Sequence, residues 1–313
     1  MRNRLNILDW LVHGGHQYEF FKLDHNFYCT NKRGLAPKYT DLGRPKNNNV
    51  KYLNRDEFLV FAKKADMLIA RSPIKQQFYD QIKTARRGKP IIGIAVVQTS
   101  EPAKIPDWVG TVVWNSEWSM IRHKGRFPKK RHYYIPHGFD PNEFCTLSVE
   151  KTGNMLTSAS FFAERGRILG FDNWKWVSGH IDKSYLIGHG NDGVPESIGS
   201  FSLNDLVRIY NSHKVYLNTT VSSAMPRSRG EAAMSGMPIV TTKNYGIEKY
   251  FINNKSCIFA DNKHDMLKAV KRIINNNNLR KDLGSSAREA AVKHFNIKDY
   301  INKWDYVISR ACR

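Results

Sequence analysis

The chain has 313 residues, 41% of them hydrophobic and 12% aromatic, which is enough apolar side chain for one large domain or two of ordinary size. This composition excludes a mainly disordered chain, and the 21 Gly and 12 Pro exclude a collagen-like or low-complexity one. There are 49 Lys and Arg against 28 Asp and Glu, and the resulting charge of +21 predicts a polyanionic partner, either nucleic acid or an anionic membrane surface.

The sequence gives no sign of a membrane span or an export signal. No stretch approaches the roughly 18 consecutive apolar residues that a span requires, and Met1–Trp10 lacks the apolar core and cleavage site of a secretory signal. The cysteines form no CxxC pair, which favours free thiols over a disulfide framework or a zinc site. A cytoplasmic protein is therefore expected.

In the first half of the chain, short continuous apolar runs alternate with amphipathic segments. This pattern is typical of strand–helix units in a parallel sheet whose two faces are covered by helices. Helices are predicted at Arg55–Ala65 and Ile74–Ala85. The predicted strands are Leu5–Val12, His25–Cys29, Met67–Ala70, Pro90–Val97, Thr111–Asn115 and His132–Ile135.

The same alternation begins again after a turn-rich break at Pro136–Pro141 and a polar stretch that ends at Gly153. The domains are accordingly placed at residues 1–145 and 146–294, followed by an amphipathic helix within 295–313. The predicted strands are Met155–Ser160, Ser184–Gly188, Val215–Asn218, Pro238–Thr242 and Cys257–Phe259. The predicted helices are Leu203–Asn211, Glu231–Ser235, Glu248–Phe251, Asp265–Asn275, Asn278–His294 and Ile297–Ala311.

Gly14 and Gly15 follow the first predicted strand and precede a helix. Two glycines at this point let the backbone approach a ligand closely, and the helix N-terminus favours an anion. The pair lacks the full GxGxxG fingerprint of dinucleotide-binding folds. A tight turn without a ligand is the alternative.

Positive charge is concentrated in residues 51–131, which hold 17 basic and 7 acidic residues. The segment could bind a polyanionic acceptor, or it could be a solvated surface kept soluble by its charge. Its densest run is Arg122, Lys124, Arg126, Lys129, Lys130 and Arg131.

The segment Pro226–Thr242 is the richest motif. Two arginines and Ser228 precede a predicted short helix that starts at Glu231, and Gly236 and Pro238 end it before a buried strand. Arginines before a helix N-terminus suit phosphate oxygens, because their forked donors and the helix dipole act together. A carboxylate in the first turn can accept hydrogen bonds from a ribose diol.

Several blocks resemble GT-B glycosyltransferases whose C-terminal domain is of the "glycosyl transferases group 1" type. Glu231–Thr242 is similar to the family's EAMASGxPVVAT block, and Tyr134–Asp140 resembles its IPNGVD segment between domains. Three further blocks occur in the family order, at Val113–Trp118, Tyr185–Gly190 and Leu203–Asn218. The resemblance implies an α/β protein of GT-B fold, with two Rossmann-like domains facing a cleft and a C-terminal helix that crosses back to the first.

The resemblance also implies a nucleotide-sugar donor, expected to be UDP-linked, held by the second domain. In such enzymes the Glu of the quoted block binds the donor ribose, here Glu231, and basic residues after the first strand of that domain hold the diphosphate, here Arg165. Arg227 and Arg229 could supplement Arg165, and His189 could line the base pocket. The resemblance implies transfer with retention of configuration and no metal or other cofactor.

The chain departs from the family pattern in ways that bear on catalysis. Ser223 stands where the family has a sugar-side Glu, and the backbone of Met225–Ser228 is a candidate replacement. The histidine common in the first domain has no certain counterpart. His16 and Thr99 lie where such a catalytic residue could face the sugar.

Three acceptor hypotheses remain. The favoured one is a hydroxymethylated-type base in double-stranded DNA, as in phage DNA glucosyltransferases, which would place the protein in a host cytoplasm. The second is a lipid or cell-wall glycan at an anionic membrane surface. The third is a nucleic-acid-binding relic of the fold without catalytic activity.

Overall fold

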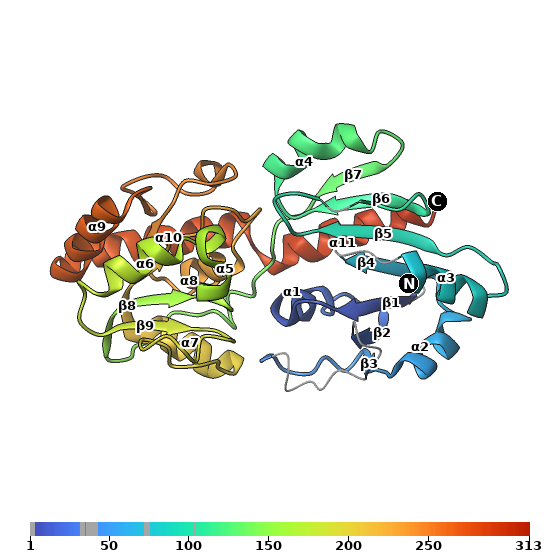
Figure 1. Cartoon of the computed structure of the whole chain (residues 1–313), viewed down its shortest axis with the longest axis horizontal. Helices are drawn as coiled ribbons and strands as arrows, with labels where there is room; N and C mark the ends of the chain where they lie inside the picture. The colour runs from blue at the N-terminus through green and yellow to red at the C-terminus, as the bar shows by residue number, and fades with distance from the viewer. Residues whose placement is uncertain (1–3, 32–34, 36–42, 72–75, 103) are drawn as a thin grey trace. The chain divides into compact units, whose positions relative to one another are not determined.

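The protein is described by a computed structural model that covers residues 4–31, 35, 43–71, 76–102 and 104–313. The chain divides into two compact units, and each is described by itself. Unit 1 contains residues 1–136 and 298–313, and unit 2 contains residues 137–297. Each unit holds one parallel sheet with helices (Figure 1), so the predicted α/β class of GT-B type is confirmed. Unit 2 begins at His137, whereas the boundary was predicted from the sequence to lie after residue 145.

Unit 1 is built on a sheet with the strand order β3-β2-β1-β4-β5-β6-β7. The first strand, β1, pairs with β2 on one side and with β4 on the other, so the direction of winding reverses between β1 and β4. The strands are β1 Asn6–Leu11, β2 Asn26–Asn31, β3 Val50–Tyr52, β4 Met67–Arg71, β5 Ile92–Val97, β6 Val109–Trp114 and β7 Arg131–Tyr134.

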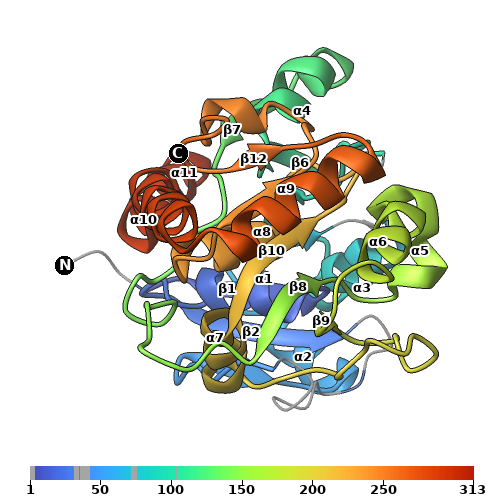
Figure 2. The same ribbon diagram turned by 90° about the vertical axis from the view of Figure 1, so that its left-hand side faces the viewer.

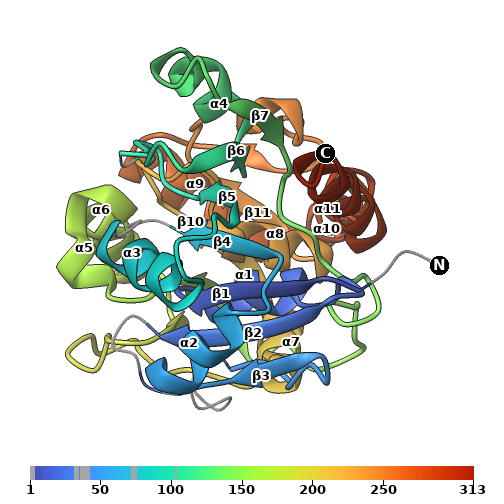
Figure 3. The same cartoon turned by 90° about the vertical axis from the view of Figure 1, so that its right-hand side faces the viewer.

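Helices cover this sheet. Figure 3 shows α2 and α3 side by side, where Phe58, Tyr79 and Ile82 pack with Leu8 and Leu68 in a buried cluster. The elements are α1 Gly14–Phe20, α2 Arg55–Ala62, α3 Gln76–Ala85, α4 Glu117–His123, a 3-10 turn η2 Lys124–Arg126, and α11 Ile297–Ala311.

The predicted strands of unit 1 are found within a few residues, and two short elements were not predicted. β3 has three residues and α4 seven, too few to show a period. The predicted helix Ile74–Ala85 corresponds to α3, but its first two residues, Ile74 and Lys75, lie outside the described residues.

Unit 2 has the strand order β12-β11-β10-β8-β9 (Figure 2). Here winding reverses between β8 and β10, because β8 pairs with both β9 and β10. The strands are β8 Gly153–Ser158, β9 Ser184–Ile187, β10 His213–Asn218, β11 Ile239–Thr241 and β12 Ile258–Phe259. The helices are α5 Phe162–Leu169, α6 Phe171–Ser178, α7 Leu203–Ser212, α8 Arg227–Met234, α9 Lys263–Asn275 and α10 Asn277–His294, with a 3-10 turn η3 Ile247–Lys249.

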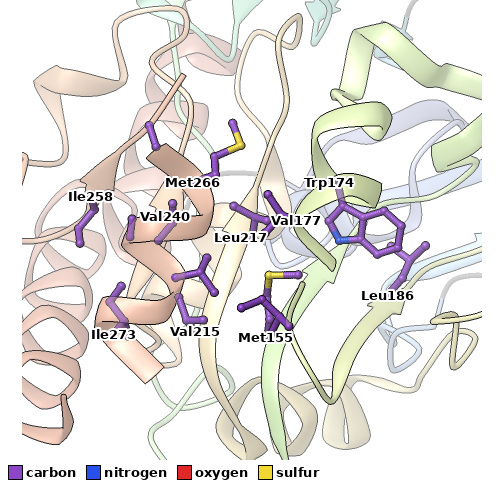
Figure 4. Close-up of a cluster of buried hydrophobic side chains, with 14 of the residues drawn as sticks. Met155, Trp174, Val177, Leu186, Val215, Leu217, Val240, Ile258, Met266 and Ile273 are labelled. Atoms are coloured by element: carbon purple, nitrogen blue, oxygen red, sulfur yellow. The ribbon is translucent and has the colours of Figure 1, made fainter. Parts of the chain in front are cut away.

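The core of unit 2 lies between its sheet, α6 and α9 (Figure 4). Met155, Val215 and Leu217 from the strands meet Trp174 of α6 and Met266 of α9, all fully buried. At roughly 25 cal/mol per Å², burying side chains of this size is the main favourable contribution to folding.

Three sequence-based element assignments in unit 2 need correction. α8 begins at Arg227, four residues before Glu231, so the two arginines belong to the helix and not to a loop. α5 and α6 were missed because Gly166 and Gly170 adopt non-helical conformations that interrupt the period. The helix predicted at Glu248–Phe251 is the single 3-10 turn η3.

No helix in the described part of the chain is long and apolar enough to cross a membrane.

Candidate nucleotide-sugar site

The carboxyl ends of β8 and β10 define the candidate site in unit 2. In open α/β sheets, ligands bind outside the carboxyl ends of the strands, at the point where the winding reverses. That point lies here between β8 and β10. The segment after β8 carries Arg165, the segment after β9 carries His189, and α8 carries Ser228 and Glu231. Four of the residues predicted from sequence therefore follow the same edge of one sheet.

A buried asparagine joins the loops that follow β8 and β9. The Asn191 side chain, 2% exposed, donates from Nδ2 to the carbonyl oxygens of Ala159 (2.7 Å) and Gly188 (3.0 Å). Its Oδ1 accepts from the backbone N–H of Phe162 (2.9 Å). Asn191 was not predicted from the sequence, although an Asn just after a GxG turn is a residue type that commonly bonds to nearby backbone.

Phe161 and His189 lie against each other through their backbones. The Phe161 N–H donates to the His189 carbonyl at 2.7 Å, and the Phe161 ring covers Gly190. Phe161 adopts a left-handed conformation with φ of 53° and is 47% exposed, an unusual state for a large apolar residue. His189 is also exposed, and its Nδ1 lies 2.9 Å from the Ser200 hydroxyl. Phe161 and His189 are therefore two exposed aromatic residues on the loops that follow β8 and β9.

Arg165 lies one helical turn beyond Phe161, and its N–H donates to the Phe161 carbonyl at 2.9 Å. The residue is exposed, and partial burial of its guanidinium lowers its pKa below the usual arginine value. Within the described residues, the guanidinium forms no ion pair with a carboxylate. Arg165 therefore offers a positive charge at this edge of the sheet.

Ser228 is held at the end of β8. The Tyr216 hydroxyl donates to Ser228 Oγ at 2.8 Å, and Ser228 Oγ donates to the Ser158 carbonyl at 3.0 Å. Burial raises the pKa of Tyr216 to about 12, so the phenol stays protonated and remains a donor. These bonds fix the first turn of α8 against the strand that leads into the Arg165 segment.

Glu231 is buried, with 4% of its surface exposed, and is already bonded within unit 2. Its Oε1 accepts from Arg227 Nε at 2.8 Å, and its Oε2 accepts from the Tyr210 hydroxyl at 3.1 Å. A carboxylate oxygen can accept a second hydrogen bond, so the ribose contact predicted for Glu231 stays a prediction. Arg227 is itself buried and lies over the Phe139 ring at 4.7 Å.

Arg229 also points into the protein. It is 2% exposed, and its Nη1 donates to Thr241 Oγ1 at 3.0 Å and to Asn244 Oδ1 at 3.1 Å. Burial lowers the pKa of Arg229 to about 10. The sequence predicted Arg227 and Arg229 as loop residues available to phosphate, whereas both contact protein groups of unit 2.

In unit 1, the residues predicted to face the sugar also lie at the carboxyl edge of a sheet. Gly14 and Gly15 begin α1 directly after β1, and neither has a left-handed φ. His16 is 4% exposed in the same turn. Thr99 follows β5, is exposed, and donates to the Glu101 carbonyl at 2.6 Å. The structure thus places His16 and Thr99 after strands that are separated in the sheet by β4.

Two members of the basic run bond to carbonyl oxygens of unit 1. Lys130 donates to the carbonyls of Pro106 (3.1 Å) and Asp107 (3.0 Å), and Arg131 donates to the carbonyl of Arg310. Arg131 is nevertheless exposed. The remaining four are also exposed and lie around α4 and η2: Arg122, which lies over the Trp118 ring at 5.1 Å, Lys124, Arg126, which is 3.7 Å from Glu101, and Lys129.

Among the described residues, no group of three or more His, Cys, Asp or Glu side chains could hold a metal ion. The expected independence from metals stays a prediction.

Comparison with known proteins identifies the fold. A family model described as "Glycosyl transferase-like" matches residues 165–304. The structure of HepE from Anabaena with UDP-glucose is similar over 98% of this chain and 100% of that one, at 11% identity and a TM-score of 0.75. A glycosyltransferase from Rickettsia africae is similar over 100% of both chains, at 12% identity and a TM-score of 0.71.

Staphylococcus aureus TarM is similar in fold with a TM-score of 0.62 and 13% identity, and its structure is a complex with Fondaparinux, alpha-GlcNAc-glycerol and UDP. The match covers 83% of this chain but only 60% of TarM. Among proteins with curated descriptions, none matches the chain in sequence. The chain therefore has the GT-B fold of these glycosyltransferases, and its residues 165–304 match a glycosyl transferase-like family model.

Proposed function

We propose that the protein transfers a sugar from a UDP-linked donor, with retention of configuration, to an acceptor bound by unit 1. The observation that carries the proposal is the grouping of Arg165, His189 and Ser228 around the winding reversal between β8 and β10. Similar folds hold UDP or UDP-glucose in the HepE structures. The departing nucleoside diphosphate carries negative charge, which a nearby positive group stabilises, and Arg165 supplies such a group.

Each group at the site has a proposed role. Arg165 binds the diphosphate, and the exposed rings of Phe161 and His189 contact the nucleotide base. Ser228 and the start of α8 contact the donor beside the end of β8. Glu231 accepts hydrogen bonds from the ribose while Arg227 and Tyr210 keep its carboxylate in place. Arg229 is assigned to the framework of unit 2, because its guanidinium is buried against Thr241 and Asn244.

The proposed acceptor is a hydroxymethylated-type base in double-stranded DNA, which the exposed cations of α4 and η2 would hold by its phosphates. A second candidate is a glycerol-containing cell-wall or lipid acceptor, because the TarM structure holds alpha-GlcNAc-glycerol beside UDP. Both acceptor classes carry phosphates or lie near anionic surfaces, so the positive charge of unit 1 suits either one.

The donor assignment is tested by measuring UDP release and sugar transfer from labelled UDP-sugars, with hydroxymethylated DNA, unmodified DNA and a lipid extract as acceptors. Arg165→Ala should lower kcat by about 100-fold, in the range seen when one preorganised donor to developing charge is removed. The matched control is Arg208→Ala, an exposed arginine in the second half of α7, which should leave kcat unchanged.

The product's anomeric configuration, read by NMR, tests retention. An inverted product would reject that part of the proposal. If no nucleotide-sugar is turned over, the proposed activity is wrong. If Arg165→Ala and Arg208→Ala behave alike, the activity stands but Arg165 is not the diphosphate ligand.

A further inference from the structure

Unit 1 contains a buried ion pair that the proposed donor site does not use. Asp9 in β1 is 0% exposed and Arg71, the last residue of β4, is 1% exposed. The guanidinium binds the carboxylate in a fork, with Arg71 Nε 2.9 Å from Asp9 Oδ1 and Nη2 2.8 Å from Oδ2. The pair therefore bridges β1 and β4, the two strands between which the winding of this sheet reverses.

Gln17 of α1 connects this ion pair to the turn after β1. Its side chain is fully buried, and Nε2 donates to Asp9 Oδ2 (3.0 Å) and to the Trp10 carbonyl (2.9 Å). Its Oε1 accepts from the backbone N–H groups of Val12 (2.7 Å) and His13 (3.1 Å). Both amide hydrogens and both acceptor positions are used, so only one orientation of the amide fits. This arrangement fixes the backbone that leads into Gly14 and Gly15.

The same guanidinium contacts His16. Arg71 Nη1 lies 3.3 Å from His16 Nδ1, and an arginine has only donors to offer. His16 Nδ1 must therefore accept, which leaves the ring proton on Nε2. A protonated Nδ1 would point its hydrogen at a buried cation. The imidazole is thus held in one tautomer by a neighbour on a different strand.

Stability alone gives little reason for this network. Burial raises the pKa of Asp9 above its usual 3.8 in spite of the opposing effect of Arg71, which shows how strongly desolvation acts here. A buried ion pair often contributes no more to stability than uncharged side chains of the same volume, because desolvation offsets the attraction. Uncharged side chains would not reproduce the two geometric effects of this network, which are a fixed turn after β1 and a fixed His16 tautomer.

We propose that Asp9, Arg71 and Gln17 are positioning residues for sugar transfer, which hold the Gly14–Gly15 turn in shape and keep His16 as the Nε2–H tautomer. His16 then acts through Nε2 as a hydrogen-bond donor and not as a proton acceptor. The activity part of this inference rests on the proposed function; the tautomer part does not.

The test uses the double variant D9N/R71M, which removes both charges but keeps an acceptor for Gln17. In the wild type, ¹⁵N NMR of the full chain should show His16 with an unprotonated Nδ1 and a protonated Nε2, the signal being assigned with His16→Gln. In D9N/R71M the Nδ1–H tautomer of His16 should become populated. The kcat should fall by up to about 100-fold, because a small misplacement of a reacting group can have an effect of this size. The melting temperature should stay close to that of the wild type.

Arg71→Lys, which keeps a positive donor beside His16, should retain the Nε2–H tautomer and part of the lost rate. A wild-type spectrum with protonated Nδ1 rejects the inference, as does a folded D9N/R71M variant that keeps kcat within about twofold. If the double variant does not fold, Gln17→Met, which releases the turn, must lower kcat for the inference to stand. Absence of any turnover by the wild type rejects the proposed function, while the NMR result still decides the tautomer.

Discussion

At the two sheet edges, charged residues fall into two groups: those that bond to the protein and those exposed to a ligand. Arg227 and Arg229 were predicted from the sequence as phosphate ligands, yet both are buried against protein acceptors. Arg165 was assigned the same role from its position after a strand, and it is exposed. The sequence thus assigned a phosphate role to all three arginines. Only the direction of each side chain, which depends on packing, separates them.

His213 provides a test at the scale of one buried residue. It is 3% exposed at the start of β10, its Nδ1 lies 2.8 Å from the Ile209 carbonyl, and its ring packs against Gly153. Burial lowers its pKa below 6.5, with Lys151 adding to the effect. The unfolded chain therefore binds a proton more readily than the folded one, and stability rises with pH in this range. The stabilisation is complete above about pH 6.5 and is lost as the pH falls through the lowered pKa.

We expect the melting temperature to drop between about pH 7 and pH 5, and the drop to be smaller in His213→Asn, which keeps a donor for the Ile209 carbonyl. His264→Asn, an exposed histidine on α9, is the control and should follow the wild type. Thermal unfolding across this pH range measures the effect. Equal pH dependence in wild type and His213→Asn would show that His213 titrates alike in the folded and unfolded chain.

Among the elements, long amphipathic helices and buried strands were predictable, and short or interrupted elements were not. α9, α10 and α11 match their predicted ranges closely because each carries several turns of a regular apolar period. α5 and α6 were not predicted, because their glycines interrupt the apolar period. The segment that positions Phe161 and Arg165 was therefore not predicted either. Asn191, which ties that segment to the β9 loop, left no periodic signal either. The sequence thus predicted the strands that precede Arg165 and His189 but not the contacts between the loops that follow them.

Gly190 tests whether the loops after β8 and β9 act as one element. It has a φ of +68°, and a Cβ there would come within 2.3 Å of the Phe161 ring. Gly190→Ala should cost about 1–2 kcal/mol from the left-handed backbone alone and displace Phe161 from the proposed base contact. UDP affinity, measured calorimetrically, should then fall by about tenfold, which corresponds to about 1.4 kcal/mol.

Gly193→Ala is the matched control, because a Cβ at Gly193 meets nothing within 4 Å. It should change neither the melting temperature nor UDP affinity. If Gly190→Ala lowers the melting temperature but leaves UDP affinity at the wild-type value, Phe161 does not contact the nucleotide.

For the whole molecule, the charge of +21 predicts a polyanionic partner but does not predict the chemistry. Alternating strands and helices predicted parallel sheets, and the fold class followed from the motif blocks. The structure divides these cations further. Lys130 and the exposed Arg131 bond to carbonyl oxygens of unit 1, whereas Arg122, Lys124, Arg126 and Lys129 are exposed around α4 and η2. Sequence composition counts all six equally. An acceptor held by phosphates should depend most on the four exposed cations around α4 and η2.

This difference leads to a prediction for DNA binding by the full chain. If duplex DNA is the acceptor, the logarithm of the binding constant should fall linearly with the logarithm of salt concentration, with a slope of about −0.9 for each phosphate contacted. Arg126→Gln together with Lys129→Gln should make that slope less steep by the amount expected for about two phosphate contacts, and should weaken binding at low salt. Lys268→Gln with Lys271→Gln, which removes two exposed charges from α9, should leave the slope unchanged.

Titrations of hydroxymethylated duplex DNA at several salt concentrations measure both pairs. Binding that is absent or insensitive to salt would reject DNA as the acceptor, and equal slopes for the two double variants would move the DNA contact away from α4 and η2.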